Sequence, residues 1–223
     1  TRKHEPDRAT AAAGAVPRAG TGVSRRVFIQ TVGVSAAAGA IRSGTERALG
    51  QDKAEPTVLG PGAVRATFRV NGKAMVAQIE PGTTLLEALR ERLDLTGAKP
   101  VCERASCGAC SVLVDGKLVA SCMMLALDAT DAEITTVEGL GEAGALDPVQ
   151  EAFIRHDALQ CGFCTPGLVV AARALLNETP KPTLSQIKKG LAGNICRCGT
   201  YTNVFNAVLD ASGQAPIRDG KGA

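Results

Sequence analysis

Cysteine is the residue type in this chain with the most chemical potential. The 223 residues include eight cysteines, which fall into two groups of four. The first group has the spacing Cys-x4-Cys-x2-Cys, with a fourth cysteine after eleven further residues: Cys102, Cys107, Cys110 and Cys122. The second group has two close pairs, with 31 residues between them: Cys161, Cys164, Cys196 and Cys198. Such groups support three kinds of chemistry, namely disulfides, zinc sites and iron–sulfur clusters.

Disulfides are the first alternative. An even number of cysteines in an exported protein ordinarily favours them. Against them, the chain is long enough to bury a core without cross-links. The single residue between Cys196 and Cys198 also gives poor geometry for a local bridge. Length and spacing therefore disfavour disulfides.

Metal ligation takes two forms. Structural zinc is commonly held by two Cys-x2–4-Cys pairs, and the pairs Cys107/Cys110 and Cys161/Cys164 both have that form. The first group as a whole has the plant-type ferredoxin spacing of a [2Fe–2S] cluster, which is a larger object to surround than one zinc ion. Only Gly and Ala stand between Cys107 and Cys110, so backbone N–H groups can approach the sulfurs. The first group therefore favours a cluster.

The second group has no ferredoxin spacing, but its neighbours place it at helix ends. Thr165-Pro166 follows Cys164 and predicts a helix start, where the helix dipole favours negatively charged thiolates. Cys196 and Cys198 likewise lie between two predicted helices. Four thiolates from two helix junctions can enclose a second cluster.

The composition excludes some functions. Aromatic residues make up only 3% of the chain, which argues against a nucleic-acid binder that stacks bases. Lys plus Arg against Asp plus Glu gives 25 − 22 = +3, but residues 1–48 carry a net +5 and the remainder a net −2. The body is therefore no polyanion binder. No catalytic constellation of residues is visible, and we expect His156 to be a solvated surface group.

Residues 1–55 are predicted to be a disordered leader that carries an export signal. Ser24-Arg25-Arg26-Val27-Phe28-Ile29 resembles a twin-arginine motif, and residues 31–41 form a weakly apolar stretch after it. That stretch is too short to span a membrane, which takes about 20 apolar residues, and no other segment is long or apolar enough. We expect periplasmic localisation, with cleavage within residues 40–56.

The first part of the body predicts a sheet domain over residues 60–138. Asn71-Gly72 and Asp115-Gly116 each separate two strand-like runs and predict hairpins, because these residue types accept positive φ. The expected strands are 64–70, 73–79, 111–114, 117–120 and 133–137. A capping box of Thr84 and Glu87 predicts a helix to about residue 93, with four leucines on one face.

The sequence of the second part predicts a helical domain over residues 146–211. Residues 139–145 would link it to the sheet domain, and residues 212–223 would form a tail. Four helix starts carry a capping signal: Asp147-Pro148, Thr165-Pro166, Thr183 with Gln186, and Thr200. The first helix is expected to end near residue 157, the second to cover 167–177 and the last 201–211. Four short helices at this spacing favour a small bundle, so the fold class is α+β.

Several strings around the cysteines resemble the iron–sulfur subunit of the xanthine oxidase family, the molybdenum hydroxylases. The similarity covers about residues 62–211, and with the leader it is closest to the iron–sulfur subunits of periplasmic aldehyde oxidoreductases. The matching strings are Cys107-Gly108-Ala109-Cys110, Thr136-Val137-Glu138-Gly139-Leu140, Gln160-Cys161-Gly162-Phe163-Cys164-Thr165-Pro166-Gly167 and Gly193-Asn194-Ile195-Cys196-Arg197-Cys198-Gly199-Thr200-Tyr201.

The resemblance implies an N-terminal β-grasp, plant-type ferredoxin domain and a C-terminal four-helix-bundle domain, each with one [2Fe–2S] cluster. It assigns the first cluster to Cys102, Cys107, Cys110 and Cys122, and the second to Cys161, Cys164, Cys196 and Cys198. It also implies a large partner subunit that binds molybdopterin and oxidises the substrate, which would be an aldehyde. Electrons would pass through both clusters to an FAD-binding subunit or another acceptor. Gln160 and Cys198 map to the side of the partner's pterin.

Two departures from the family pattern and two alternatives remain. Family members commonly have Gly before the first cysteine, where this chain has Val101. Family members commonly have Gly at position 105, where this chain has Ala, so a positive φ there would cost free energy. The alternatives are a free-standing [2Fe–2S] carrier or sensor without an enzyme partner, and a zinc-stapled binding module. The substrate pocket belongs to another chain on the leading reading, so this sequence does not define the substrate.

Overall fold

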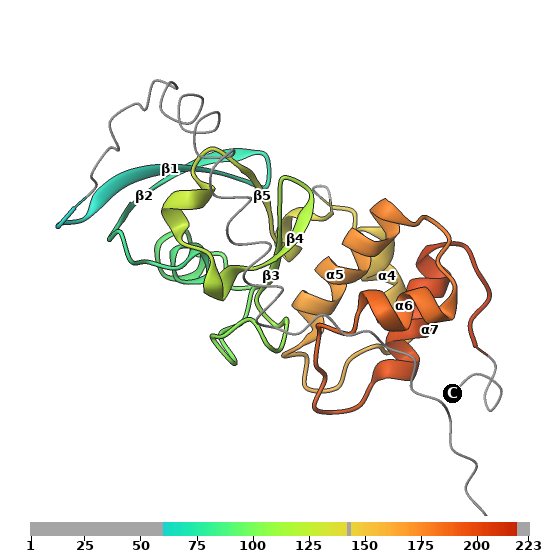
Figure 1. Ribbon diagram of the computed structural model, residues 1–223. Coiled ribbons are helices and arrows are strands. Elements are labelled where there is room, and N and C mark those ends of the chain that lie inside the picture. The colour runs from blue at the N-terminus through green and yellow to red at the C-terminus, as the bar shows by residue number, and fades with distance from the viewer. Residues whose placement is uncertain (1–59, 142–143, 218–223) are drawn as a thin grey trace, which may run out of the picture. The chain divides into compact units, whose positions relative to one another are not determined.

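The computed structural model describes residues 60–141 and 144–217, which belong to one compact unit, Val58–Ala223 (Figure 1). The leader predicted for residues 1–55, with its twin-arginine motif, lies outside the described residues, as does the end of the expected tail. Within the described part, no helix is both long and apolar enough to cross a membrane.

A mixed sheet of five strands forms the first half of the described chain. The strands are β1 (Val64–Val70), β2 (Lys73–Ile79), β3 (Ser111–Val114), β4 (Lys117–Ala120) and β5 (Glu133–Thr135). Their order in the sheet is β2-β1-β5-β3-β4, with β1 and β5 parallel and the other neighbours antiparallel. The structure confirms both predicted hairpins.

The hairpin turns use the left-handed backbone conformation that their residues favour. Asn71 and Gly72 have φ of 52° and 72°, and Asp115 and Gly116 have 49° and 75°. β5 ends two residues earlier than expected. The reason is that the backbone N–H of Thr136 donates to the Asn71 side chain, at 2.9 Å, instead of continuing the ladder.

Short helical turns lie between and after the strands. They are α3 (Leu85–Glu87), η1 (Ala88–Arg92), η2 (Ser121–Met123), η3 (Ala126–Ala129) and η4 (Val137–Gly139). The predicted capping box of Thr84 and Glu87 is present at α3. The expected single helix continues as a π-helical turn, η1, and its leucine face is buried as predicted: Leu85, Leu86, Leu89 and Leu93.

Four helices follow in the second half: α4 (Pro148–Arg155), α5 (Thr165–Glu178), α6 (Leu184–Gly190) and α7 (Tyr201–Ala211). The predicted capping boxes at Asp147 and Thr183 are both present. α4 ends before residue 157, because Asp157 takes a left-handed φ of 48°.

Two of the expected caps do not form. α5 begins at Thr165 itself, so Cys164 is the residue before the helix, and the hydroxyl oxygen of Thr165 has no hydrogen-bond partner. Thr200 does precede α7, but its side chain makes no capping hydrogen bond. Thr165 follows Cys164 directly, and Thr200 lies two residues after Cys198; the contact that Thr200 makes instead is described below.

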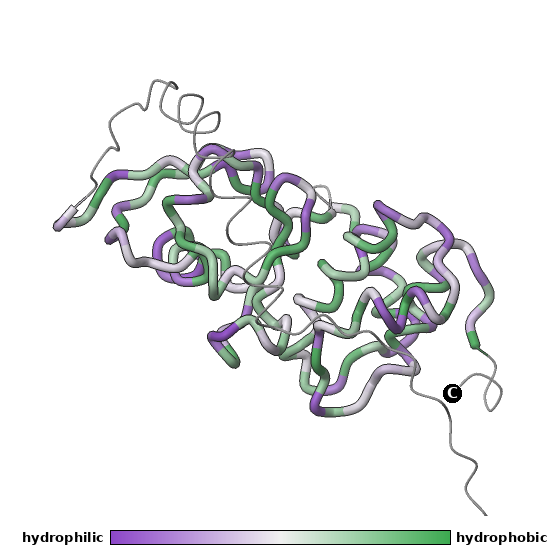
Figure 2. Tube along the Cα trace, in the orientation of Figure 1, coloured by the Kyte–Doolittle hydropathy of each residue, from purple (hydrophilic) through white to green (hydrophobic). Residues whose placement is uncertain are grey.

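The sheet and the helices each bury their own core, and α5 packs against β3 and β4. Phe68 and Ile134 are fully buried in the sheet core, and Leu168 in the helical core. Leu113 of β3 packs against Val170 and Ala174 of α5, which joins the two cores. Figure 2 shows the apolar residues running along the central strands and α5. Because this contact packs the sheet against the helices, the two groups of cysteines lie in the same compact unit of the chain.

Candidate metal centres

The first cysteine group lies in the loop before β3 and in the turn η2 after β4. Cys110 and Cys122 are buried, whereas Cys102 and Cys107 are half-buried, and none of the eight cysteines forms a disulfide. The thiols lie in neighbouring pairs, with Cys102 beside Cys107 and Cys110 beside Cys122. Cys102 also interacts electrostatically with Cys122, so the two pairs face one another. The structure thus brings together all four residues of the first predicted group.

The loop turns its backbone N–H groups toward these sulfurs. The N–H of Ala105 donates to Cys122 Sγ and that of Ser106 to Cys102 Sγ, both at 3.3 Å. Glu103 and Ala105 hold this shape with φ of 50° and 55°, so position 105 does take the positive φ that glycine favours.

Hydrogen bonds and burial act in opposite directions on the acidities of this group. Hydrogen bonds from the backbone of Arg104 and then from the Cys107 thiol lower the pKa of Cys102 to about 6. Burial raises the pKa of Cys122, and the neighbouring thiols add to that effect. The hydrogen bonds to Cys102 favour its thiolate, the form in which cysteine binds metals.

The second group is held at the starts of α5 and α7. Cys161 and Cys198 are exposed and adjacent, while Cys196 is buried beside the half-buried Cys164. The four predicted residues therefore come together here too, again as two pairs. Cys198 and Gln160, which the resemblance assigned to a partner's pterin, are both exposed.

Acidity differs sharply within the second group. Burial, and then the neighbouring Cys196, raise the pKa of Cys164 to about 12. Burial would also raise the pKa of Cys196, but hydrogen bonds, first those from the side chain and backbone of Thr200 and then those from Cys164 and Gly199, outweigh it and lower the pKa to about 7. The hydroxyl oxygen of Thr200 lies 3.3 Å from Cys196 Sγ.

The two cysteine groups are joined directly by hydrogen bonds. The N–H of Ile195 donates to the carbonyl of Cys107, at 2.9 Å. The side-chain amide of Asn194, which is only 4% exposed, donates to the carbonyl of Gly108, also at 2.9 Å. A residue next to Cys196 therefore holds the loop of Cys107, and the geometry of one group depends on the other.

Comparison with known proteins decides the family. Residues 68–137 match the "2Fe-2S iron-sulfur cluster binding domain" family and residues 136–209 the "[2Fe-2S] binding domain" family. The aldehyde oxidoreductase iron-sulfur-binding subunit PaoA of Escherichia coli O157:H7 is 39% identical over 207 residues, which cover 86% of this chain and 89% of PaoA. The chain belongs to the iron–sulfur subunits of the molybdenum hydroxylases.

Solved structures agree with this assignment. A chain of quinoline 2-oxidoreductase from Pseudomonas putida 86 is 40% identical, with a TM-score of 0.64 over 70% of this chain and 99% of that one. The aldehyde oxidoreductase of Desulfovibrio desulfuricans is 42% identical, with a TM-score of 0.63 over 66% of this chain but only 17% of its own. The present chain is thus an electron-transfer subunit of an oxidoreductase complex and carries two [2Fe–2S]-binding domains.

Sequence reasoning missed three residues of this iron–sulfur subunit. Thr200 was interpreted as a helix cap, whereas its hydroxyl contacts a cysteine sulfur. The hydroxyl of Tyr201 accepts the N–H of Cys196, at 2.8 Å, and Asn194 joins the two loops. The only signal for them was their place in one string around Cys196 and Cys198, because their contacts arise in the folded chain.

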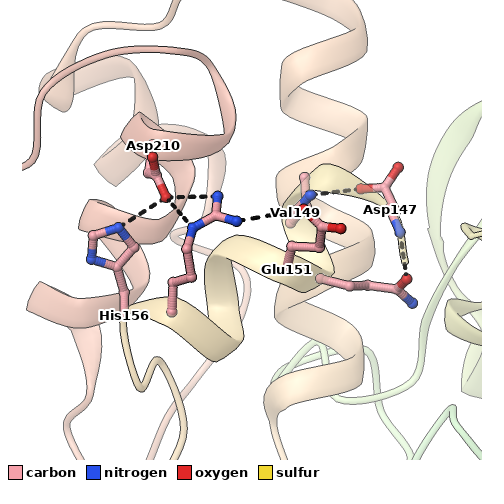
Figure 3. Close-up of polar contacts among 7 residues, drawn as sticks. Asp147, Val149, Glu151, His156 and Asp210 are labelled. Carbon is pink, nitrogen blue, oxygen red and sulfur yellow. Dashed lines mark hydrogen bonds and ion pairs between the residues drawn. The ribbon is translucent and has the colours of Figure 1, made fainter. Parts of the chain in front are cut away.

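His156 is a partly buried member of a polar cluster, not the solvated group expected. Its ring Nε2 lies 3.1 Å from a carboxylate oxygen of Asp210 on α7, and Arg155 donates to the same oxygen at 2.9 Å (Figure 3). The cluster contains none of the eight cysteines and holds α4 against α7.

Proposed function

We propose that this chain is the iron–sulfur relay of a periplasmic molybdenum hydroxylase that oxidises aldehydes. The observation that carries the proposal is the gathering of two sets of four thiols, each arranged as two pairs. One [2Fe–2S] cluster would be held by Cys102, Cys107, Cys110 and Cys122, and the other by Cys161, Cys164, Cys196 and Cys198. No residue of this chain is assigned a catalytic role toward the substrate.

The donor sets fit that cofactor. Four thiolates bind a [2Fe–2S] cluster, two on each iron, which corresponds to the paired arrangement of both groups. The backbone N–H bonds of Ala105 and Ser106 and the hydroxyl of Thr200 stabilise negative charge on the sulfurs. When bound, such a cluster supplies a reversible one-electron redox centre. The chain's residues hold it, shield its buried side and tune its charge.

The proposed cluster assignment also divides the described chain into two domains. The sheet and its cysteine loop, residues 60–138, would be the β-grasp ferredoxin domain. The helices within residues 146–211 would form the four-helix domain. The plant-type spacing of the first cysteine group and the position of the second at the starts of α5 and α7 support this division.

A large molybdopterin-binding subunit is the expected partner. In the aldehyde oxidoreductase of Desulfovibrio desulfuricans the matched region is only 17% of a longer chain, so the present chain corresponds to one part of that enzyme. The exposed Gln160 and Cys198 would face the partner's pterin, and an FAD-binding subunit or another acceptor would receive the electrons. Similarity to PaoA favours an aldehyde as the substrate.

Arg25-Arg26, followed by Phe28 and an apolar stretch, supports export by the twin-arginine route. Replacing both arginines with lysine is expected to leave the loaded complex in the cytoplasm. The activity of the periplasmic fraction, compared with that of a variant that carries lysine at Arg2 and Arg8, measures this. Undiminished periplasmic activity of the Arg25/Arg26 variant would show that the motif is not the signal.

The cluster assignment is tested by metal content. The full chain, purified anaerobically with its complex, should contain about four iron and four acid-labile sulfide per chain, on the two-cluster reading. Cys110→Ser and Cys164→Ser should each lower the iron to about two and abolish a different electron paramagnetic resonance (EPR) signal. Ser106→Ala alters the first loop without removing a thiol and should keep about four. Stoichiometric zinc without sulfide would overturn the proposal.

The same preparation separates a complex subunit from a free-standing carrier. Molybdenum that co-purifies with the tagged chain through size-exclusion chromatography supports the partner proposed here. An iron-loaded chain that elutes alone, without molybdenum, would favour a free carrier.

A further inference from the structure

Thr200 stands at the position before α7 where a threonine hydroxyl ordinarily caps the helix. Its backbone has the φ and ψ of −75° and 20°, and its side chain makes no capping bond. The hydroxyl oxygen lies instead 3.3 Å from the Sγ atom of Cys196, and Cys196 is only 6% exposed. The Thr200 hydroxyl therefore contacts a cysteine sulfur in place of the helix-capping hydrogen bond that threonine favours at this position.

The surroundings of Cys196 fix the direction of this hydrogen bond. A cysteine that binds iron is a thiolate and has no proton to donate, so the hydroxyl of Thr200 must be the donor. The adjacent hydroxyl of Tyr201 accepts the N–H of Cys196, at 2.8 Å, and so holds the cysteine backbone in place. Two consecutive hydroxyl groups thus hold one ligand, one through its sulfur and one through its main chain.

We propose that Thr200 is a positioning residue that raises the reduction potential of the second redox centre by donating its hydroxyl proton to Cys196 Sγ. This inference rests on the proposed function, because it takes Cys196 as a cluster ligand. Reduction adds negative charge to the centre, and a hydrogen bond to a ligand sulfur stabilises the more negative state. Removing the donor therefore shifts the potential downward.

The test is a redox titration of the intact complex, followed by EPR. Thr200→Val preserves the shape of the side chain and removes only the hydroxyl, and no capping bond is lost with it. At a fixed potential the ratio of reduced to oxidised second centre should fall about tenfold, which corresponds to about 59 mV for a one-electron couple. Thr200→Ser keeps the hydroxyl and should remain near the wild-type value.

Two controls distinguish tuning from general damage. Thr202→Val makes the same change at an exposed threonine of α7 and should leave the potential unchanged. The first centre of the same chain should keep its potential in the Thr200→Val protein. A second measurement detects the hydroxyl directly: the coupling of an exchangeable proton to the reduced centre, seen by pulsed EPR after transfer to D2O, should be lost in Thr200→Val and present in Thr200→Ser.

The outcomes are separable from those of the proposed function. If wild-type protein contains about four iron but Thr200→Val and Thr200→Ser have the same potential, the role of Thr200 is refuted and the cluster assignment stands. An equal shift of both centres, or a shift in Thr202→Val, would also refute it. If Thr200→Val does not retain the second centre, Thr200→Ala takes its place in the same comparison with Thr200→Ser.

Discussion

The side-chain amide of Asn194 donates a hydrogen bond to the carbonyl of Gly108, and this contact joins residues that lie 86 positions apart in the chain. The same amide lies 3.3 Å from the hydroxyl of Ser111, which donates to the Gly108 carbonyl as well. Asn194 is two residues from Cys196, and Gly108 is next to Cys107. The two cysteine groups are therefore parts of one hydrogen-bonded structure, although each has its own ligands.

Asn194→Ala should destabilise the chain by about 1–3 kcal/mol, because a buried hydrogen bond is lost and its partners are left less satisfied. For a chain of this size the expected fall in Tm is about 2–4 °C per kcal/mol, measured on the loaded protein by differential scanning calorimetry. Asn203→Ala removes a side-chain hydrogen bond of α7 to the Asp157 carbonyl at an exposed site and is the matched control. Equal Tm values for the two variants would contradict a special role for Asn194.

Alanine substitutions at Gly108 and Gly116, compared with each other, distinguish backbone strain from steric conflict. Both have positive φ, 69° and 75°, so alanine at either site costs about 1–2 kcal/mol of backbone strain. A Cβ at Gly108 would also lie 2.5 Å from the Asn194 amide nitrogen and 2.6 Å from the Gly193 carbonyl oxygen, whereas nothing lies within 4 Å at Gly116.

We therefore expect Gly116→Ala to lower Tm by a few degrees and to keep its iron. Gly108→Ala should lower Tm further and release iron, because the loop of Cys107 must move away from Asn194. Iron content and Tm of the two purified variants provide the comparison. If Gly108→Ala keeps its iron and has the same Tm as Gly116→Ala, the loop of Cys107 can move away from Asn194 without losing its metal. The coupling of the two cysteine loops would then be weaker than inferred.

The elements of the fold were predictable where short-range chemistry decides them. Asn71-Gly72 and Asp115-Gly116 specify tight turns, and the Thr84 and Thr183 capping boxes specify helix starts, because the partners are within three residues. The cysteine spacing likewise predicted which thiols come together. The structure places the thiols of each set near one another, and their role as cluster ligands stays a prediction.

The failures arose where a distant residue competes for a local group. β5 stops early because Asn71, 65 residues away, takes the N–H of Thr136. Thr200 does not cap α7 because its hydroxyl contacts Cys196. The contact between Asn194 and Gly108 exists only after the sheet and the helices have packed together, so neither neighbourhood alone contains a signal for it.

Ala105 is a residue whose replacement should stabilise the protein. It has a φ of 55° in the first cysteine loop, where alanine is strained by about 1–2 kcal/mol and glycine is not. Glycine loses more conformational entropy on folding, by about 0.5–1 kcal/mol, so the net gain for Ala105→Gly is between about 0 and 1.5 kcal/mol. The same change at Ala174, inside α5, should have the opposite sign. Tm measurements on both loaded variants test this, and a lower Tm for Ala105→Gly would rule out relief of strain.

Asp210 provides a prediction about pH. A hydrogen bond from Arg155, and then one from His156, lower the pKa of its carboxyl group in the folded chain. The carboxylate form is therefore favoured by folding, so its stabilising contribution is present above the unfolded pKa and is lost as the pH falls through the folded pKa. Asp210→Asn should lower Tm at pH 7, and the difference from wild type should shrink as the pH falls below about 4, the usual pKa of an aspartate in the unfolded chain.

Salt and a second substitution identify the partner responsible. The Asp210 carboxylate is partly exposed, so 0.5 M NaCl should reduce the effect of Asp210→Asn at pH 7. Arg155→Gln removes the first of the two donors, and in that background Asp210→Asn should cost less than in the wild type. If instead the two substitutions are additive and independent of salt, the side chains act separately, and the contact between α4 and α7 depends on apolar packing alone.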